Sequence, residues 1–262
     1  MDTGSAAAAH GGNTGLGGSR AHLTLCLLDD FQFRVDGILV SLAIPIQRLL
    51  AYLAVHQRPV SRSAIAGRLW LDVPERRASG SLRSALWRLS REGIQPVTST
   101  STHLSLSQAV AVDLYEAHAV ARVLGDHTGT ALPDIRAAQL LSRDLLPDWY
   151  DEWLYIERER FRQIRLHALE ALCERLTAAG RYALAIDSGL AAVTAEPLRE
   201  SAHRALIKAH LAEGNRSEAL RQYQRLCELL STNLTASPSE DIRRLVRWSP
   251  PTIPSAIAPP GR

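Results

Sequence analysis

The sequence predicts an α+β domain followed by an all-α domain, and three observations support this order. Apolar residues alternate with polar ones between residues 23 and 42, as they do in half-buried strands. Segments with helical periodicity follow, and alternation returns near residues 97–112. Beyond residue 113 turn-forming residues become rare and helical periodicity takes over. A chain of 262 residues, 46% of them hydrophobic, is long enough for two domains.

The expected limits follow from these changes in pattern. They are a disordered N-terminal tail at 1–20, a first domain at 21–112, a helical domain at 113–247 and a disordered Pro-rich tail at 248–262. Both tails are rich in Gly, Ser, Ala or Pro, and such segments bury too little apolar surface to fold.

The first domain is expected to begin with a small antiparallel sheet. Its alternating apolar residues are Leu23, Leu25 and Leu27, then Phe31, Phe33 and Val35, then Ile38, Val40 and Leu42. Asp36-Gly37 separates the last two runs and is typical of a two-residue hairpin turn. Pro45 then suits the first turn of a helix, where its missing N–H needs no partner. The apolar face of that helix consists of Ile46, Leu49, Leu50 and Leu53.

A second helix is expected over 62–70, with Ser61 as its capping residue. A polar loop over 71–77 follows. Residues 75–92, ERRASGSLRSALWRLSRE, predict an amphipathic helix with an almost wholly basic polar face. Its buried stripe consists of Leu82, Leu86 and Leu89, and its other face carries Arg83, Trp87 and Arg91 at a spacing of four, beside Ser84 and Arg88.

This basic face suits a nucleic-acid groove, because guanidinium groups bind phosphates and can fork onto the O6 and N7 of guanine. A solvated helix whose arginines keep the protein soluble is the alternative. Two arrangements are also open for Trp87, which either faces the groove or packs inward.

A hairpin is expected to close the first domain, with strands at 97–99 and 104–107 around 100–103 and a last short strand at Val110 and Val112. A sheet, three helices and a terminal hairpin make a winged helix, whose third helix enters the major groove. The order resembles the OmpR-type winged helix. It resembles more closely the DNA-binding half of the actinobacterial antibiotic regulatory proteins (SARPs), through residues 58–89, RPVSRSAIAGRLWLDVPERRASGSLRSALWRL.

Charge is distributed unevenly between the two domains. Residues 21–112 hold ten Arg against six acidic residues, and residues 113–247 hold eighteen Lys and Arg against twenty. An anionic partner for the first domain is expected. Of the 30 basic residues 29 are Arg, and Lys208 is the only Lys, which a GC-rich coding sequence would also explain.

An internal repeat predicts the architecture of the second domain. AAGRYALAI, from Ala178, matches LAEGNRSEAL 34 residues later, with Gly180 over Gly214 and Ala185 over Ala219. Thirty-four residues is the tetratricopeptide period. The predicted fold class is therefore an α+β winged helix followed by an all-α tetratricopeptide-like helical domain.

The second domain resembles the bacterial transcriptional activation domain that follows the winged helix in the SARP family. The matching segments are LLPDWYDEWLYIERERFRQ at 145–163 and AAVTAEPLRESAHRALIKAHLAEGNRSEALRQYQRL at 191–226. The aromatic cluster in the first segment is expected in the core. The sequence departs from the family at Leu71, where Pro is usual, at Gly80 and Ser90, and in a wing tip, TSTSTH, that is neither Gly-rich nor basic.

Motifs of catalysis are absent from the sequence. It contains no Walker loop, GxGxxG, HExxH or GxSxG, and its cysteines and histidines lack metal-ligand spacing. We therefore expect no enzyme, no catalytic residue, no cofactor and no metal. The absence of a signal peptide or of about 20 consecutive apolar residues predicts a cytoplasmic protein with no membrane partner.

The resemblance implies a sequence-specific transcriptional activator that binds promoter direct repeats of double-stranded DNA as a homodimer and recruits the RNA polymerase holoenzyme, often for a biosynthetic gene cluster. The residues expected in the groove are Arg83, Ser84, Trp87, Arg88 and Arg91. Those expected at phosphates are Arg62 at the helix cap and Arg76 and Arg77 just before the basic helix. By resemblance, the polymerase contacts are Asp72, Glu75 and Arg77.

A second function is compatible with the same residues. The helical repeats would form a protein-interaction scaffold, and the basic face of the winged helix would bind an acidic protein partner. The ratio of affinities for cognate and random DNA separates the two functions, because salt dependence alone is common to any basic protein.

Overall fold

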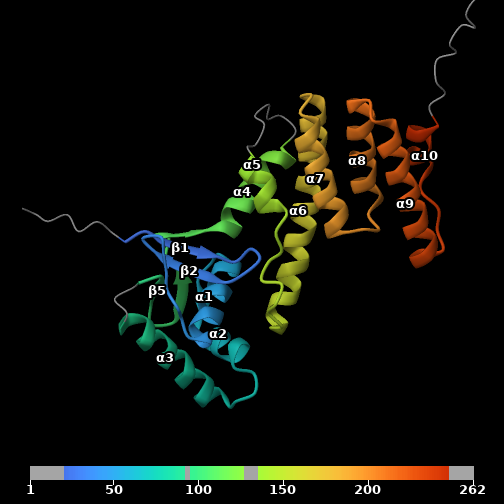
Figure 1. The fold of residues 1–262 in the computed structure, drawn as a ribbon. Helices are drawn as coiled ribbons and strands as arrows, with labels where there is room; N and C mark the ends of the chain where they lie inside the picture. The colour runs from blue at the N-terminus through green and yellow to red at the C-terminus, as the bar shows by residue number, and fades with distance from the viewer. Residues whose placement is uncertain (1–20, 92–94, 127–134, 248–262) are drawn as a thin grey trace, which may run out of the picture.

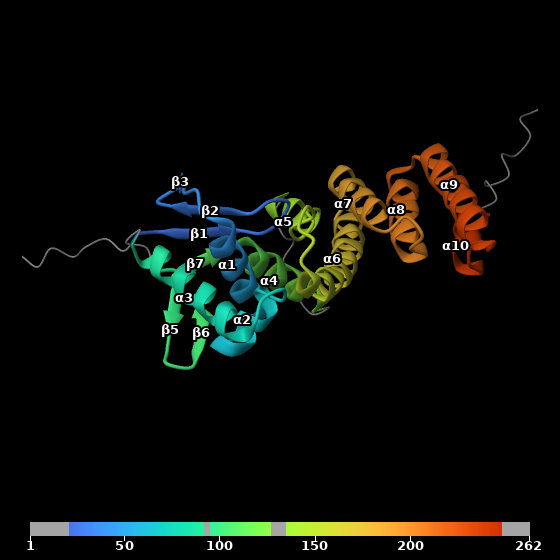
Figure 2. The same cartoon turned by 90° about the horizontal axis from the view of Figure 1, so that it is seen from below.

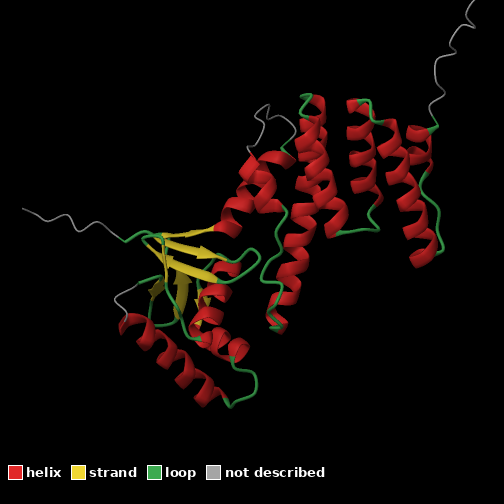
Figure 3. Ribbon diagram, viewed as in Figure 1, coloured by secondary structure: helices red, strands yellow, loops and turns green. Residues whose placement is uncertain are grey.

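The computed structural model describes residues 21–91, 95–126 and 135–247. Figure 1 shows a part that contains the strands, followed by a row of helices up to the C-terminal end. Figure 3 shows that the described strands are confined to the first part. The predicted tails at 1–20 and 248–262, and Glu92 of the predicted basic helix, lie outside the described residues.

The leading sheet contains β1 (Leu23–Cys26), β2 (Gln32–Val35), β3 (Ile38–Leu39) and β7 (Val110–Val112), in the order β3-β2-β1-β7. The strands β1 to β3 are antiparallel, as predicted. At the β2–β3 turn Asp36 and Gly37 have φ of 50° and 83°. A type I′ turn requires positive φ at both places, so the predicted hairpin is confirmed. The last strand, β7, pairs with β1 in parallel.

The helices of the first domain are α1 (Ile44–His56), α2 (Arg62–Leu69) and α3 (Glu75–Arg91). Pro45 lies in the first turn of α1, and the predicted apolar face of α1 is buried. Ser61 caps α2, because its Oγ accepts a hydrogen bond from the N–H of Ala64 at 3.3 Å. The remaining strands, β4 (Val60–Ser61), β5 (Val97–Ser99) and β6 (His103–Leu106), form a sheet in the order β4-β6-β5. The predicted winged helix is confirmed.

The second domain is helical, as predicted. Its elements are α4 (Asp113–Gly125), α5 (Ile135–Leu141), α6 (Glu152–Ala178), α7 (Tyr182–Ala195), α8 (Glu200–Glu213), α9 (Arg216–Leu234) and α10 (Glu240–Val246). Lys208 on α8 pairs with Glu174 on α6, with 3.4 Å between Nζ and Oε1.

The 34-residue repeat corresponds to two helical hairpins that end in the same way. Gly180 follows α6 with φ of 72°, and Gly214 follows α8 with φ of 89°. The next N–H in each turn bonds back across the helix end, Arg181 to the Leu176 carbonyl at 2.9 Å and Asn215 to the His210 carbonyl at 2.8 Å. This is the Schellman arrangement, which favours glycine at the left-handed position. Ala185 and Ala219 are completely buried where the helices meet, so the predicted repeat is confirmed.

One hydrophobic core extends across both sides of residue 112. It contains the buried residues of β1 and of α1 to α3 together with Leu114 on α4, Leu145, and Trp153 and Phe161 on α6. A second core lies between α4, α6, α7 and α8, and a third contains residues of α8, α9 and α10. The beginning of the helical domain therefore covers the apolar surface of the winged helix.

Polar groups fix the same junction. The Asp113 carboxylate accepts hydrogen bonds from the N–H groups of Leu27 at 2.9 Å and Leu28 at 3.1 Å. Burial raises the pKa of Asp113, and these bonds lower it in part. The Asp151 carboxylate accepts hydrogen bonds from Nε of Arg48 on α1 at 2.8 Å and from Nε1 of Trp153 at 3.0 Å.

The prediction that the aromatic cluster at 149–155 lies in the core is correct for half of its members. Trp153 is buried against Tyr52, with 5.1 Å between ring centroids, and Trp149 stacks on Phe31 at 5.7 Å. Tyr150 and Tyr155 are 95% and 74% exposed. Helix geometry explains the exposure of Tyr155, because residues two apart on a helix point in nearly opposite directions.

We expect Asp151→Ala to destabilise the fold by about 1–3 kcal/mol, because it leaves Arg48 and Trp153 without their acceptor at a partly buried site. Urea unfolding of the whole chain measures this loss. Glu218→Ala is the control, because the pair of Glu218 with Arg221 is exposed and contributes roughly 0–1 kcal/mol. Equal stability of both variants would contradict a structural role for Asp151.

Candidate nucleic-acid interface

The helix α3 presents a continuous basic ridge to solvent. Ala78, Leu82, Ala85 and Leu89 are buried on its inner side. The predicted site residues on its outer side are all exposed: Arg76, Arg77, Arg83, Ser84, Trp87, Arg88 and Arg91. No acidic residue occurs between Arg76 and Arg91, so the ridge carries one sign of charge.

Arg76 and Arg77 belong to this ridge, and the prediction that they precede the helix is wrong. The Pro74 carbonyl accepts the first helical hydrogen bonds, from the N–H groups of Arg77 at 2.8 Å and Ala78 at 3.0 Å. Proline suits the entrance to a helix because the first N–H groups have no partner inside the helix. The helix therefore begins at Glu75, as predicted for the segment 75–92, and the loop is shorter than the predicted 71–77. Residues 71–77 are nevertheless all exposed, as expected, including Asp72, Glu75 and Arg77.

Trp87 faces outward, which decides between the two arrangements that the sequence allows. Its side chain is 59% exposed. The guanidinium carbon of Arg91, one turn further along α3, lies 4.9 Å from the centre of the Trp87 ring. This distance is typical of a cation–π contact.

Arg62 joins α2 to the wing formed by β5 and β6. Its Nε donates a hydrogen bond to the Thr100 carbonyl at 3.1 Å, and its Nη2 donates one to Oγ of Ser99 at 2.5 Å. The backbone N–H of Arg62 also bonds to the Thr102 carbonyl at 2.9 Å. Arg62 thus brings a positive charge to a wing tip that has no basic residue of its own. Figure 2 shows the β5–β6 hairpin beside α3.

Two hollows flank the ridge of α3. The one beside the wing has a volume of about 390 Å³, and its lining includes Arg62 and Arg83. The one beside the beginning of α1 has a volume of about 480 Å³, and its lining includes Arg77 and Arg88. A helix inserted in a major groove has a phosphate strand on either side, and each of these hollows holds one guanidinium group away from the centre of the ridge, Arg62 in the first and Arg77 in the second.

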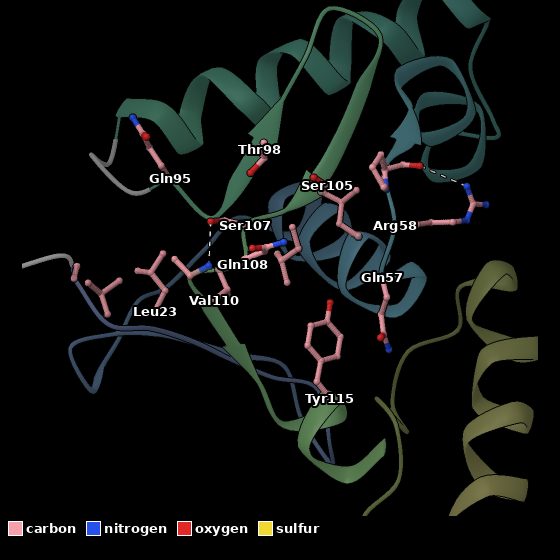
Figure 4. Close-up of a pocket in the computed structure, with 16 residues that line it drawn as sticks. Leu23, Gln57, Arg58, Gln95, Thr98, Ser105, Ser107, Gln108, Val110 and Tyr115 are labelled. Atoms are coloured by element: carbon pink, nitrogen blue, oxygen red, sulfur yellow. Dashed lines mark hydrogen bonds between the residues drawn. The ribbon is translucent and has the colours of Figure 1, made fainter. Parts of the chain in front are cut away.

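A larger hollow of about 1200 Å³ lies between the two sheets, and no residue of α3 lines it. Figure 4 shows side chains from β1, the end of α1, the β5–β6 hairpin and β7 around it, with Arg58 at one side. The Tyr115 hydroxyl in its lining donates a hydrogen bond to the Ala54 carbonyl at 2.9 Å, and burial raises the pKa of Tyr115 to about 12. The α3 ridge, with its cluster of cationic groups, is the stronger candidate for a binding site.

The contact of Arg62 with the wing was not predicted from the sequence. It depends on the pairing of β4 with β6, which places Ser61 opposite His103. Ser90 and Ser99 on the wing side, and Gly80 and Ser81 on the other side, also line the hollows and were not predicted as site residues. Helical spacing from Arg83 and Arg88 could have found Gly80, Ser81 and Ser90, which lie on α3. Ser99 lies on β5, and no local pattern places it beside α3.

Among the described residues, no helix is long and apolar enough to cross a membrane. The described residues also contain no cluster of three or more His, Cys, Asp or Glu side chains that could hold a metal ion.

Comparison with known proteins identifies the family. Residues 105–247 match the model of the bacterial transcriptional activator domain. The chain belongs to this family. The bacterial transcriptional activator domain family comprises transcriptional regulators, and the resemblance to SARP-type activators is thereby confirmed.

The fold is similar to that of a solved structure. The structure titled Mycobacterium tuberculosis EmbR in complex with low affinity phosphopeptide superimposes with a TM-score of 0.68 and 24% sequence identity. The match covers 86% of this chain and 64% of the EmbR chain, so this chain spans less than two thirds of EmbR. No curated protein matches the sequence. The similarity to EmbR supports the order of a winged helix followed by a tetratricopeptide-like domain.

Proposed function

We propose that this member of the bacterial transcriptional activator domain family binds double-stranded DNA sequence-specifically through α3. The observation that carries the proposal is the ridge of guanidinium groups on α3, without an intervening acid and with a cationic hollow on each side. In a winged helix, the helix in this position enters the major groove. Arg83, Ser84, Trp87, Arg88 and Arg91 would face base edges, and Arg62, Arg76 and Arg77 would bind phosphates.

The proposed activator would bind direct repeats in a promoter as a homodimer and recruit the RNA polymerase holoenzyme, with a biosynthetic gene cluster as a target. The rival proposal, a scaffold that binds an acidic protein partner, uses the same ridge without base contacts. Selection of bound duplexes from a random-sequence library by the whole chain tests the choice. Specific binding requires about 10³-fold or greater preference for the selected duplex over random DNA. An acidic partner site would give no enriched sequence.

Substitutions on α3 and at Arg62 are expected to have different effects. Arg83→Ala or Arg88→Ala should cost about 1–3 kcal/mol on the selected duplex and relax the choice of one base, because a forked contact with guanine is lost. Arg62→Ala should weaken binding to all sequences alike and reduce the salt slope by about one, because a phosphate contact is lost. Gel-shift titration at several salt concentrations measures both effects.

Arg58→Ala is the matched control for these variants. It removes the same charge from the same domain, but Arg58 lines the hollow between the sheets and not those beside α3. We expect this control to keep base preference and nearly full affinity. Wild-type affinity in the Arg83, Arg88 and Arg62 variants would show that α3 does not face DNA.

The exposed acids near the beginning of α3 are proposed to contact polymerase. Asp72 and Glu75 are exposed, next to Leu71 and Val73, which are 57% and 36% exposed. Arg77 was predicted with them, but it also lines the hollow beside α1, so its substitution would disturb DNA binding as well.

The double variant Asp72→Ala, Glu75→Ala should therefore reduce transcription in a reconstituted assay without weakening DNA binding. A loss of about fivefold corresponds to a contact of about 1 kcal/mol. The double variant Glu213→Ala, Glu228→Ala makes the same change in charge at exposed sites of the helical domain and should remain active. Full activation by the Asp72, Glu75 variant would remove the proposed polymerase contact.

Dimeric binding predicts dependence on the spacing between repeats. Because the helical domain shares a core with the winged helix, two chains in contact hold their α3 helices at a fixed angle and distance. Two repeats should be occupied cooperatively, and insertion of about 5 base pairs, half a helical turn, should abolish the cooperativity. Insertion of about 10 base pairs, a full turn, should preserve more cooperativity than insertion of about 5. Independent occupancy at every spacing, measured by gel shift, would contradict the dimer.

A further inference from the structure

Trp87 lies at the centre of the outer side of α3. Successive residues of an α-helix are rotated by about 100°, and this rotation places Trp87 almost opposite the buried row of Ala78, Leu82, Ala85 and Leu89. Arg83 and Ser84 lie on either side of Trp87 around the helix. If α3 enters a groove with its buried row facing the protein, the Trp87 ring points toward the floor of that groove.

The chemistry of Trp87 differs from that of the rest of the ridge. The other exposed site residues on α3 are Arg or Ser, whereas Trp87 places an indole with 59% of its surface in water. Burial of this apolar surface against an apolar group of a partner would stabilise the complex. A phosphate or the polar edge of guanine does not provide such a group.

The guanidinium group of Arg91 covers one face of the Trp87 ring. The guanidinium carbon lies 4.9 Å from the ring centre, over one face of the indole. A contact of this kind favours one orientation of the ring, and a side chain with a preferred orientation loses less freedom when it binds.

Among the base edges in the major groove, the 5-methyl group of thymine is the apolar one. We infer that Trp87 is a specificity-determining residue that binds the 5-methyl group of one thymine in the target sequence. This inference rests on the proposed function, because it requires that α3 enter the major groove of a specific duplex.

Replacement of thymine by uracil tests the inference, because it removes the methyl group and leaves base pairing unchanged. The probe is the duplex selected from the random-sequence library by the whole chain, with each thymine replaced in turn. We expect wild-type affinity to fall about fourfold at one position, the effect of burying one methyl group. In Trp87→Ala, the same replacement should have no effect at that position.

Two further variants make the result specific to the ring. Trp87→Phe keeps an aromatic group and should keep part of the sensitivity to the methyl group. Tyr155→Ala removes another aromatic side chain, which is 74% exposed and lies on α6. This variant should keep the full sensitivity to the methyl group. Far-UV circular dichroism checks that the exposed substitutions leave the fold intact.

The outcomes separate this inference from the proposed function. A selected duplex whose uracil variants bind equally well, or whose sensitive position persists in Trp87→Ala, overturns the inference and leaves specific DNA binding in place. Equal weakening of every sequence by Trp87→Ala would indicate contact with sugar or phosphate and also overturns it. Failure to enrich any sequence would overturn the proposed function and the inference together.

Discussion

The attachment of the helical domain to the winged helix through Asp113 and Asp151 is the constraint on which the rest of the structure depends. Each carboxylate lies at the junction and accepts hydrogen bonds from the first domain, Asp113 from the Leu27 and Leu28 backbone and Asp151 from Arg48. The hydrophobic core that both domains share contains the buried face of α1, and α3 packs against α1. The orientation of the basic ridge and that of the helical repeats are thus fixed relative to each other.

Local patterns predicted most of the fold because its elements follow the periodicity of their own residues. Asp36-Gly37 predicted the hairpin because both residues readily adopt the positive φ that its turn requires. The repeat that aligns Gly180 with Gly214 predicted the two helical hairpins. The parallel pairing of β7 with β1 and the common core that extends past residue 112 were not predicted. Both depend on contacts between segments far apart in the chain, which neither alternation nor helical spacing contains.

The part of the candidate site that lies on one helix was predicted, and the part that depends on contacts between distant segments was not. The amphipathic pattern of α3 predicted which arginines are exposed. It left two positions for Trp87, because an aromatic residue suits a core as well as a groove, and the structure places the ring outside. The predicted helix over 75–92 begins where α3 begins, at Glu75. The placement of Arg76 and Arg77 in the loop before it was wrong, because the Pro74 carbonyl already accepts helical hydrogen bonds from Arg77 and Ala78. The Arg62 contact required knowledge of the wing pairing.

The absence of lysine from the ridge has a consequence for regulation. Every positive side chain that the winged helix offers to a phosphate is a guanidinium, and the chain's single Lys208 lies on α8, paired with Glu174. Acetylation neutralises lysine side chains but not arginine, and guanidinium groups stay protonated at any physiological pH. Lysine acetylation would therefore leave the charge of this surface unchanged, and covalent control of that charge would have to act on serine hydroxyls such as that of Ser84.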